Sequence, residues 1–255
     1  MKVIVITGGS AGIGAASARE LARRGDCRLV LASRTPEALD RVARELTVET
    51  RTVAADVTRR ADVERIRDEA LRAFGSVDVW INNAGRGITR PVLELTDDEV
   101  DAILAVNLKS VLYGIQAIVP YFKERGTGHL INVSSFLGRV PMATVRSVYS
   151  AAKAGVNTLT ANLRMDLRRT HPGIHVSLII PAIVDTDFHR NAIGGLGTPP
   201  PGASPMKPQT ADEVASVIAN VIERPVAEVY TNPVTASLAA RYYQDVGAFE
   251  EGAGR

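Results

Sequence analysis

The chain has 255 residues, of which 45% are apolar and 23% charged, as is ordinary for a globular protein. Its formal net charge of +2 gives no electrostatic reason to expect nucleic acid or an anionic membrane as a partner. Cys27 is the only cysteine, which excludes an internal disulfide and a multi-cysteine metal site, and its apolar surroundings favour a small buried side chain. We predict one domain over residues 1–255, because a chain of this length can bury one sizeable core.

The first strand is expected from Val3 to Ile6, an apolar β-branched run typical of a buried parallel strand. The glycine-rich stretch Thr7–Gly14 follows at once, and a helix is predicted from Ala15 to Arg24. Such a strand-to-helix turn aims backbone amides at an anion, and glycines allow a pyrophosphate to approach closely. The alternative is a turn with no ligand.

The second strand, residues 28–32, ends at Ser33 and Arg34, where a dinucleotide fold presents the side chain that reads the ribose. An acidic residue there would accept from the 2′-hydroxyl of NAD. Arginine can instead hold a 2′-phosphate in two hydrogen bonds, so we predict NADP(H) over NAD(H). Arg34 as an ordinary surface cation is the other interpretation.

Strands and helices continue to alternate with short connections, which predicts an α/β fold with a doubly wound parallel sheet, Rossmann-like, with helices on both faces. The predicted strand at residues 50–55 leads to Asp56 and Val57, beside which an adenine ring could lie. The next strand, 77–81, leads to Asn82–Gly85, where small residues allow close approach. The predicted helices between these strands are 36–46 and 60–74.

One long helix is predicted over residues 97–122, with Thr96 as its N-cap and the polar Asn107 inside its apolar stretch. Asn107 must find hydrogen-bond partners, either for packing or at a site. The fifth strand, 129–133, delivers Ser134 and Ser135 to the ligand-binding edge.

Tyr149 and Lys153 stand four residues apart on a predicted helix, so both side chains project from one face. A free phenol titrates near pH 10, and a tyrosine that works as a base at neutral pH needs about 4 kcal/mol of phenolate stabilisation. A neighbouring ammonium supplies part of that. A solvated helix face is the alternative when the pair is taken alone.

Residues 187–209 are predicted to form a substrate lid, since Gly194 to Pro208 is rich in glycine and proline. The capping box Thr210–Glu213 opens a helix to about Ile222. Residues 227–231 are predicted as the last strand and residues 237–249 as a helix. Arg86, Arg139 and Arg146 are interpreted as solvated, with recognition of an acidic substrate as the alternative.

The assembled motifs resemble those of the short-chain dehydrogenases/reductases, in the shorter branch of that family, over nearly the whole chain. The family pattern TGxxxGxG corresponds to Thr7, Gly8, Gly12 and Gly14, and its NNAG pattern to Asn82–Gly85. Two departures are visible: Ala182 replaces a usual glycine, and Ala11 stands where members that prefer NADP often carry a basic residue.

The resemblance implies a catalytic set of Asn107, Ser135, Tyr149 and Lys153, acting on a carbonyl or secondary alcohol. Tyr149 would donate the proton, Ser135 would hydrogen-bond the reacting oxygen, Lys153 would hold the nicotinamide ribose and lower the Tyr149 pKa, and Asn107 would anchor a water. The predicted cofactor contacts are Gly8, Ser10, Gly12, Ile13, Gly14, Ser33, Arg34, Asp56, Val57, Asn83, Ala84, Gly85, Tyr149, Lys153, Pro181, Ile183, Val184 and Thr186.

By resemblance alone, a homodimer or homotetramer is implied. We expect a cytoplasmic protein, because no apolar run approaches the ~18 residues of a membrane span and the first strand begins near Lys2. The four histidines lack ligand-like spacing, so no metal is predicted. Two further functions stay open: an NAD-dependent alcohol dehydrogenase working in oxidation, and a non-catalytic regulator that senses NADP(H).

Overall fold

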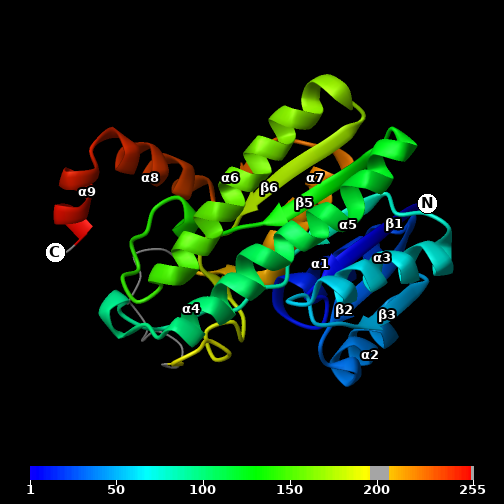
Figure 1. Cartoon of the computed structure of the whole chain (residues 1–255), viewed down its shortest axis with the longest axis horizontal. Coiled ribbons are helices and arrows are strands. Elements are labelled where there is room, and N and C mark those ends of the chain that lie inside the picture. Colours follow the sequence, from blue (N-terminus) through cyan, green and yellow to red (C-terminus); the bar gives the residue numbers. More distant parts are fainter. Residues whose placement is uncertain (196–206, 254–255) are drawn as a thin grey trace.

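The computed structural model describes residues 1–195 and 207–253, and it places a seven-stranded parallel sheet at the centre of the molecule (Figure 1). The strand order is β3-β2-β1-β4-β5-β6-β9, so the order reverses beside β1, as expected for a doubly wound sheet. The main-sheet strands are β1 (Lys2–Thr7), β2 (Cys27–Ser33), β3 (Thr50–Ala54), β4 (Val79–Asn82), β5 (Gly128–Val133), β6 (Ile174–Ile180) and β9 (Glu228–Tyr230).

Helices cover both faces of this sheet, which confirms the predicted architecture. One apolar cluster joins the sheet to α1 (Gly12–Arg24), α2 (Pro36–Glu45) and α7 (Ala211–Glu223). The other joins it to α3 (Arg60–Phe74), α5 (Ser110–Arg125) and α6 (Ser147–Thr170). Alternate residues of β1 enter opposite clusters, because side chains of a strand alternate between its faces.

The predicted helix at residues 97–122 is present but contains a π-helical turn. It consists of α4 (Asp97–Leu104), a π turn (Ala105–Lys109) and α5, with Asn107 buried inside the turn. Thr96 caps its start as predicted, and together with Glu99 it forms a capping box. Asp97–Arg125 is long and apolar enough to span a membrane, with a mean hydropathy of 1.6 over its best window, but 44% of that window is buried inside the protein. Its apolar residues pack against β4, β5 and α3.

The C-terminal region differs from the prediction of one helix over 237–249. It forms α8 (Pro233–Gln244) and α9 (Val246–Ala253), with a break at Asp245, whose extended backbone ends α8. Asn232 caps α8 by accepting a hydrogen bond from the Val234 amide. In Figure 1 the two helices extend away from the sheet, on the side opposite the N-terminus.

The connection after β6 is partly described. A two-residue strand, β7 (Val184–Asp185), pairs with β8 (Gln209–Thr210). Ile193 is hydrogen-bonded through its backbone to Gly87 and Thr89, which ties residues 187–195 to the loop after β4. Residues 196–206 of the predicted lid lie outside the described residues. The capping box at Thr210 and Glu213 opens α7 as predicted.

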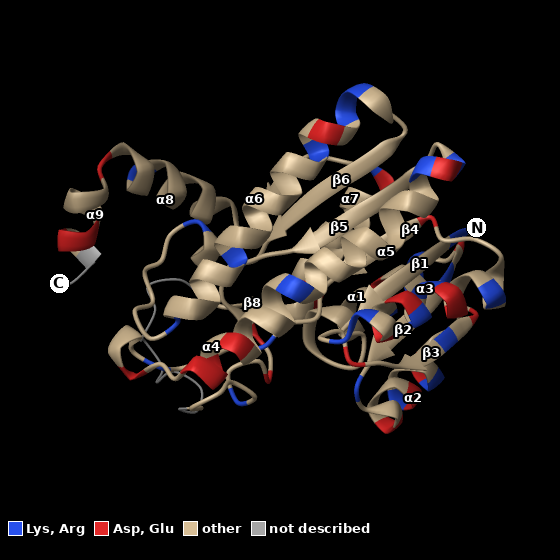
Figure 2. Ribbon diagram, viewed as in Figure 1, with Lys and Arg blue, Asp and Glu red and all other residues tan. Residues whose placement is uncertain are grey.

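Two short 3₁₀ turns, Val92–Glu94 and Phe136–Gly138, complete the described elements. Figure 2 shows basic and acidic residues interspersed along α2 and α3, with no separation of the two signs. This agrees with the small net charge of +2.

Candidate active site

The glycine turn after β1 and the loop after β4 are joined by hydrogen bonds at the carboxyl edge of the sheet. The Thr7 hydroxyl accepts from the backbone amides of Asn83 and Ala84, at 3.0 and 3.2 Å. The Asn83 side-chain amide donates to the carbonyl oxygens of Thr7 and Gly8. The Asn83 side chain is therefore committed to holding the turn in place, and a ligand would meet chiefly backbone and small residues here.

Two glycines of the turn are required by close approach. Gly8 has φ of +68°, and a Cβ there would lie 2.9 Å from Cα of Ala84. A Cβ on Gly14 would lie 2.2 Å from the Gly8 carbonyl oxygen. The turn therefore has no side chains at these glycines, and the backbone amides at the start of α1 stay accessible. This glycine cradle, residues 8–14, fits a pyrophosphate.

A cavity of about 1080 Å³ runs along this edge from the end of β2 to Tyr149. Gly14, Asn107 and Ile183 are the predicted site residues that do not line it; Gly14 lies beneath the turn and Asn107 is fully buried. The predicted residues that line the cavity are Gly8, Ser10, Gly12, Ile13, Ser33, Arg34, Asp56, Val57, Asn83, Ala84, Gly85, Ser135, Tyr149, Lys153, Pro181, Val184 and Thr186.

Arg34 stands at one end of the cavity with Ser33 and Thr35. Its side chain is exposed, and it forms no ion pair within the described part of the chain, whereas Arg19 on α1 is paired with Glu45. Asp56, also in the cavity wall, accepts hydrogen bonds from the amide and hydroxyl of Thr58. A ligand at this end would therefore find an available guanidinium and a carboxylate that is already hydrogen-bonded.

Tyr149 and Ser135 meet at the other end. Tyr149 is 7% exposed, and burial raises the pKa of its phenol to about 12, while Ser135 and the charge of Arg146 act to lower it. The Ser135 oxygen accepts from the Leu137 amide, so its own proton is available to another acceptor. Ser134, in contrast, donates to Asn157 at 2.5 Å. The structure thus brings Ser135, and not Ser134, to the phenol.

Lys153 lies one turn further along α6 and is 3% exposed. Its ammonium donates to the Val133 carbonyl at 2.9 Å and stands 5.8 Å from the centroid of the Tyr149 ring. Burial lowers the Lys153 pKa to about 8. The expected lowering of the Tyr149 pKa by Lys153 is not found in this geometry, in which Ser135 and Arg146 have that effect.

Asn107 is fully buried in the π turn. Its side-chain nitrogen donates to the carbonyls of Arg86 and Ile103, at 2.8 and 3.0 Å, and its side-chain oxygen accepts from the Arg86 amide. One amide proton therefore fastens the loop after β4 to the helix, and the other is used within the helix itself. Its role in holding a water stays a prediction.

Sequence reasoning missed the surroundings of Tyr149. Arg146, interpreted as solvated, is only 9% exposed and donates to Nδ1 of His189 at 3.0 Å. Phe188 packs edge-to-face on the Tyr149 ring, with centroids 5.6 Å apart. The available signal was the position of Arg146 three residues before Tyr149, which puts it on the same side of the helix.

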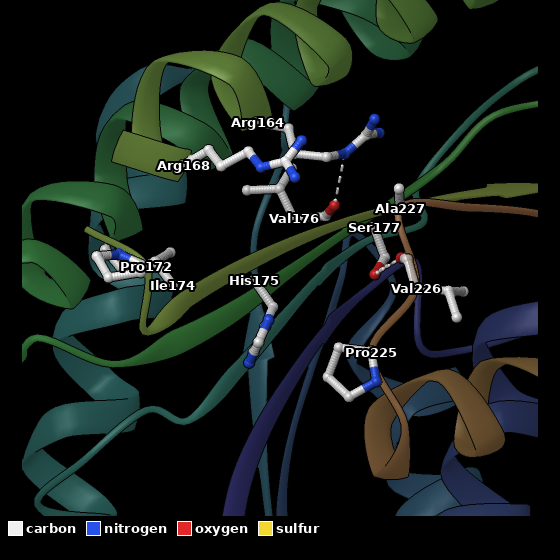
Figure 3. Close-up of a pocket in the computed structure, with 10 residues that line it drawn as sticks. All are labelled: Arg164, Arg168, Pro172, Ile174, His175, Val176, Ser177, Pro225, Val226 and Ala227. Carbon is white, nitrogen blue, oxygen red and sulfur yellow. Dashed lines mark hydrogen bonds between the residues drawn. The ribbon is translucent and has the colours of Figure 1, made fainter. Parts of the chain in front are cut away.

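A second hollow, of about 390 Å³, lies at the amino ends of β6 and β9. Figure 3 shows Arg164 and Arg168 from α6 above it, with Arg164 hydrogen-bonded to the Val176 carbonyl. None of the predicted site residues lines this hollow. Within the described residues, no group of three or more His, Cys, Asp or Glu side chains is placed to hold a metal.

A glycine cradle, a long cavity at the carboxyl edge of a doubly wound sheet and a buried Ser-Tyr-Lys set define a nicotinamide-dependent oxidoreductase of the Rossmann class. A family model described as short chain dehydrogenase matches residues 2–194, and the chain belongs to this family. An uncharacterized oxidoreductase of Staphylococcus epidermidis is 35% identical over 185 residues, which are 72% of this chain and 79% of that protein.

Solved structures show the same relationship. A short chain dehydrogenase/reductase from Burkholderia phymatum in complex with NAD has a TM-score of 0.85 and 27% identity, covering 97% of this chain and 94% of that one. A short-chain dehydrogenase from Sphingobium yanoikuyae in complex with NADPH has a TM-score of 0.80 and 29% identity, covering 97% and 93%. Similar proteins therefore bind either nicotinamide cofactor.

Proposed function

We propose that this protein is an NADP(H)-dependent reductase of carbonyl compounds, with Tyr149 as the general acid. The observation that carries the proposal is the buried pair of Ser135 and Tyr149 at one end of a cavity that has the exposed guanidinium of Arg34 at its other end. Because the chain belongs to the short-chain dehydrogenase family, we assign this pair to the proton donation that accompanies hydride transfer.

The bound cofactor supplies a hydride. A carbonyl oxygen becomes anionic as hydride reaches its carbon, so donors placed beforehand stabilise the transition state more than the ground state. In our proposal the Tyr149 phenol gives its proton to this oxygen, Ser135 donates a hydrogen bond to it, and Lys153 holds the nicotinamide ribose.

Tyr149 can act as the acid in reduction. Burial raises the pKa of its phenol to about 12, so at neutral pH the phenol carries a proton that it can donate. The alternative of an NAD-dependent alcohol dehydrogenase working in oxidation is disfavoured by Ser33 and Arg34, because NAD binding calls for an acidic residue at that place. A regulator without turnover would not need the Ser135 and Tyr149 donors.

NADP(H) is preferred in this proposal because of Arg34. An exposed guanidinium at the end of β2 that has no carboxylate partner among the residues the structure describes is suited to a 2′-phosphate, and it has no acceptor for a 2′-hydroxyl. The NADPH complex of the Sphingobium yanoikuyae relative supports this choice, and the NAD complex of the Burkholderia phymatum relative is the reason to test it. A homodimer or homotetramer is proposed from the resemblance alone, and a cytoplasmic location from the sequence pattern.

The test is oxidation of NADPH and NADH by the purified protein with a panel of aldehydes, ketones, quinones and ketoacyl thioesters. Turnover with NADPH should fall at least a hundredfold in Tyr149→Phe, because general acid catalysis contributes ~10²–10⁴-fold. NADPH binding, measured by fluorescence, should stay within about threefold, since the ring is kept. A fall of less than about tenfold in turnover would exclude Tyr149 as the general acid.

A further inference from the structure

Arg146 immediately precedes α6 and is buried beside the catalytic end of the cavity. Gly87, Phe188 and Ala192 cover it: a Cβ on Gly87 would lie 2.6 Å from Nη1 of Arg146 and 2.9 Å from the Phe188 ring. Residue 87 must therefore stay without a side chain for the guanidinium to keep this place. Arg146 is also absent from the residues that line the cavity, so it lies behind the cavity wall.

The charged and titratable groups around Arg146 come from four segments. Tyr149 and Lys153 lie on its own helix, and His189 follows β7 and accepts from Nη2 of Arg146. The charge of Asp185 acts to raise the pKa of His189. Arg90 forms a backbone β-bridge with Arg146, and its side chain is paired with Glu99.

No carboxylate is paired with Arg146, and its Nη1 has no hydrogen-bond partner, within residues 1–195 and 207–253. Buried charges are costly unless they are compensated. Tyr149 lies one helical turn from Arg146, and Phe188, which adjoins Gly87 together with Nη1 of Arg146, packs on the Tyr149 ring with centroids 5.6 Å apart. In this position the charge of Arg146 acts to lower the pKa of the Tyr149 phenol. Nδ1 of His189 accepts the hydrogen bond, so His189 must be neutral and holds the guanidinium without cancelling its charge.

We propose that Arg146 is a positioning residue whose buried positive charge stabilises the phenolate that Tyr149 becomes when it gives up its proton. The proposal deepens the proposed function and rests on Tyr149 as the proton donor. When Tyr149 donates its proton to the reacting oxygen, negative charge moves onto the phenol oxygen, and Arg146 is fixed in place before that happens. Direct binding of an anionic substrate by Arg146 is disfavoured because Nη1 is covered and faces Gly87.

The test follows the ionisation of Tyr149 itself. Protein labelled with ¹³C at Cζ of tyrosine is saturated with NADP⁺ and titrated by NMR to pH 10.5, and the Tyr149 signal is identified by its loss in Tyr149→Phe. At pH 10.5 the displacement of this signal from its neutral position gives the fraction of phenolate. Arg146→Gln, which can still donate to His189 but has no charge, should lower that fraction at least threefold.

Arg146→Lys should keep the fraction within about twofold, because it restores the charge. Arg168→Met, which removes an exposed arginine at the other end of α6, is the matched control and should leave the signal unchanged. If Arg146→Gln fails to fold, Arg146→Met and Arg146→Lys provide the same comparison, with thermal unfolding to check each variant. An unchanged Tyr149 titration in a folded, uncharged variant would overturn the proposal.

The enzyme assay separates this proposal from the proposed function. With the best carbonyl compound of the panel, Arg146→Gln should lower kcat and change its pH profile, with KM within about twofold. A rise in KM for carboxylate-bearing carbonyls alone, with the titration unmoved, would instead assign Arg146 to substrate binding. If Tyr149→Phe keeps its activity while the titration depends on Arg146, the proposed function fails and the electrostatic coupling stands.

Discussion

The two edges of the sheet both carry hollows with arginines beside them, yet they are built differently. At the carboxyl edge, bare glycine turns and strand ends line a cavity of about 1080 Å³ that contains the whole Ser135, Tyr149 and Lys153 set. At the amino edge, a hollow of about 390 Å³ is lined by the ends of β6, β9 and α6 (Figure 3). Parallel strands direct their loops and helix N-termini to the first edge, which explains why ligand chemistry gathers there.

Arg164 of α6 and Arg146, which immediately precedes this helix, differ in the same way. Burial lowers the pKa of Arg164, and the nearby charge of Glu228 acts in the opposite direction; Arg164 also donates to the Val176 carbonyl. Burial lowers the pKa of Arg146 as well, but the group that opposes this is Tyr149. Arg164 therefore serves the packing of the sheet at one end of the helix, whereas in our proposal Arg146 acts on the Tyr149 phenol at the other end.

The largest effect is expected from Lys153→Met at the carboxyl edge. Turnover with NADPH should fall at least a thousandfold, because the ammonium that we propose to hold the ribose is lost together with the orientation of the cofactor. Steady-state kinetics and NADPH binding measure the change. Lys123→Met, an exposed lysine on α5, is the control and should keep wild-type turnover. If turnover in Lys153→Met stayed within tenfold of wild type, the carboxyl edge would not be the site of catalysis that we propose.

At the amino edge, the buried His129 should make the free energy of unfolding depend on pH, and it should not affect catalysis. Burial lowers its pKa from 6.5 to about 3, and its Nδ1 has no partner within the described residues. Because the folded protein keeps His129 neutral, the unfolded chain binds the additional proton below pH 6.5. The stability that depends on this histidine is complete above that pH and is lost as the pH falls toward 3.

The free energy of unfolding should therefore drop by roughly 2 kcal/mol between pH 6.5 and 5 through His129 alone. Urea unfolding at the two pH values measures the drop, and His129→Leu should remove most of it. His175→Gln replaces an exposed histidine whose ring lies 5.8 Å from that of His129, and it should leave the drop in place. An equal drop in wild type and His129→Leu would show that His129 is not the responsible group.

Arg34→Ala tests the end of the cavity where we propose that the 2′-phosphate of NADPH binds. Loss of a charge-assisted contact to a 2′-phosphate should weaken NADPH binding by about tenfold or more, with NADH within about threefold. Fluorescence titration with both cofactors is the measurement, and Arg41→Ala on the exposed side of α2 is the control. Equal losses for both cofactors would show that Arg34 does not read the phosphate.

The smallest effect is expected from Phe188→Ala. The edge-to-face contact with Tyr149 is worth ~0.5–1.5 kcal/mol, so kcat/KM should fall by about two- to tenfold through a less well positioned phenol. Phe74→Ala at the amino edge should lower thermal stability instead and leave kcat/KM within about twofold, since Phe74 contacts Arg28 and lies outside the cavity. Kinetics and thermal unfolding of both variants test this, and equal effects of the two substitutions on kcat/KM would show that the two edges do not differ in this way.

The sequence by itself determined the layered sheet and the order of its motifs, because hydrophobic period, glycine turns and helix caps act over neighbouring residues. The capping boxes at Thr96 and Thr210 and the turn after β1 are of this kind. Membership of the short-chain dehydrogenase family followed from the same local patterns.

Only the tertiary structure decided what depends on segments distant in the chain. It inserted a π turn at Asn107, where the side chain reaches Arg86 across 21 residues of sequence, and it divided the C-terminal helix at Asp245. It also buried Arg146, whose guanidinium lies against Gly87 beside Phe188 and donates to His189, 43 residues further along the chain. Burial is a property of the whole packed chain, so the charges that act on Tyr149 could not be read from the residues around it.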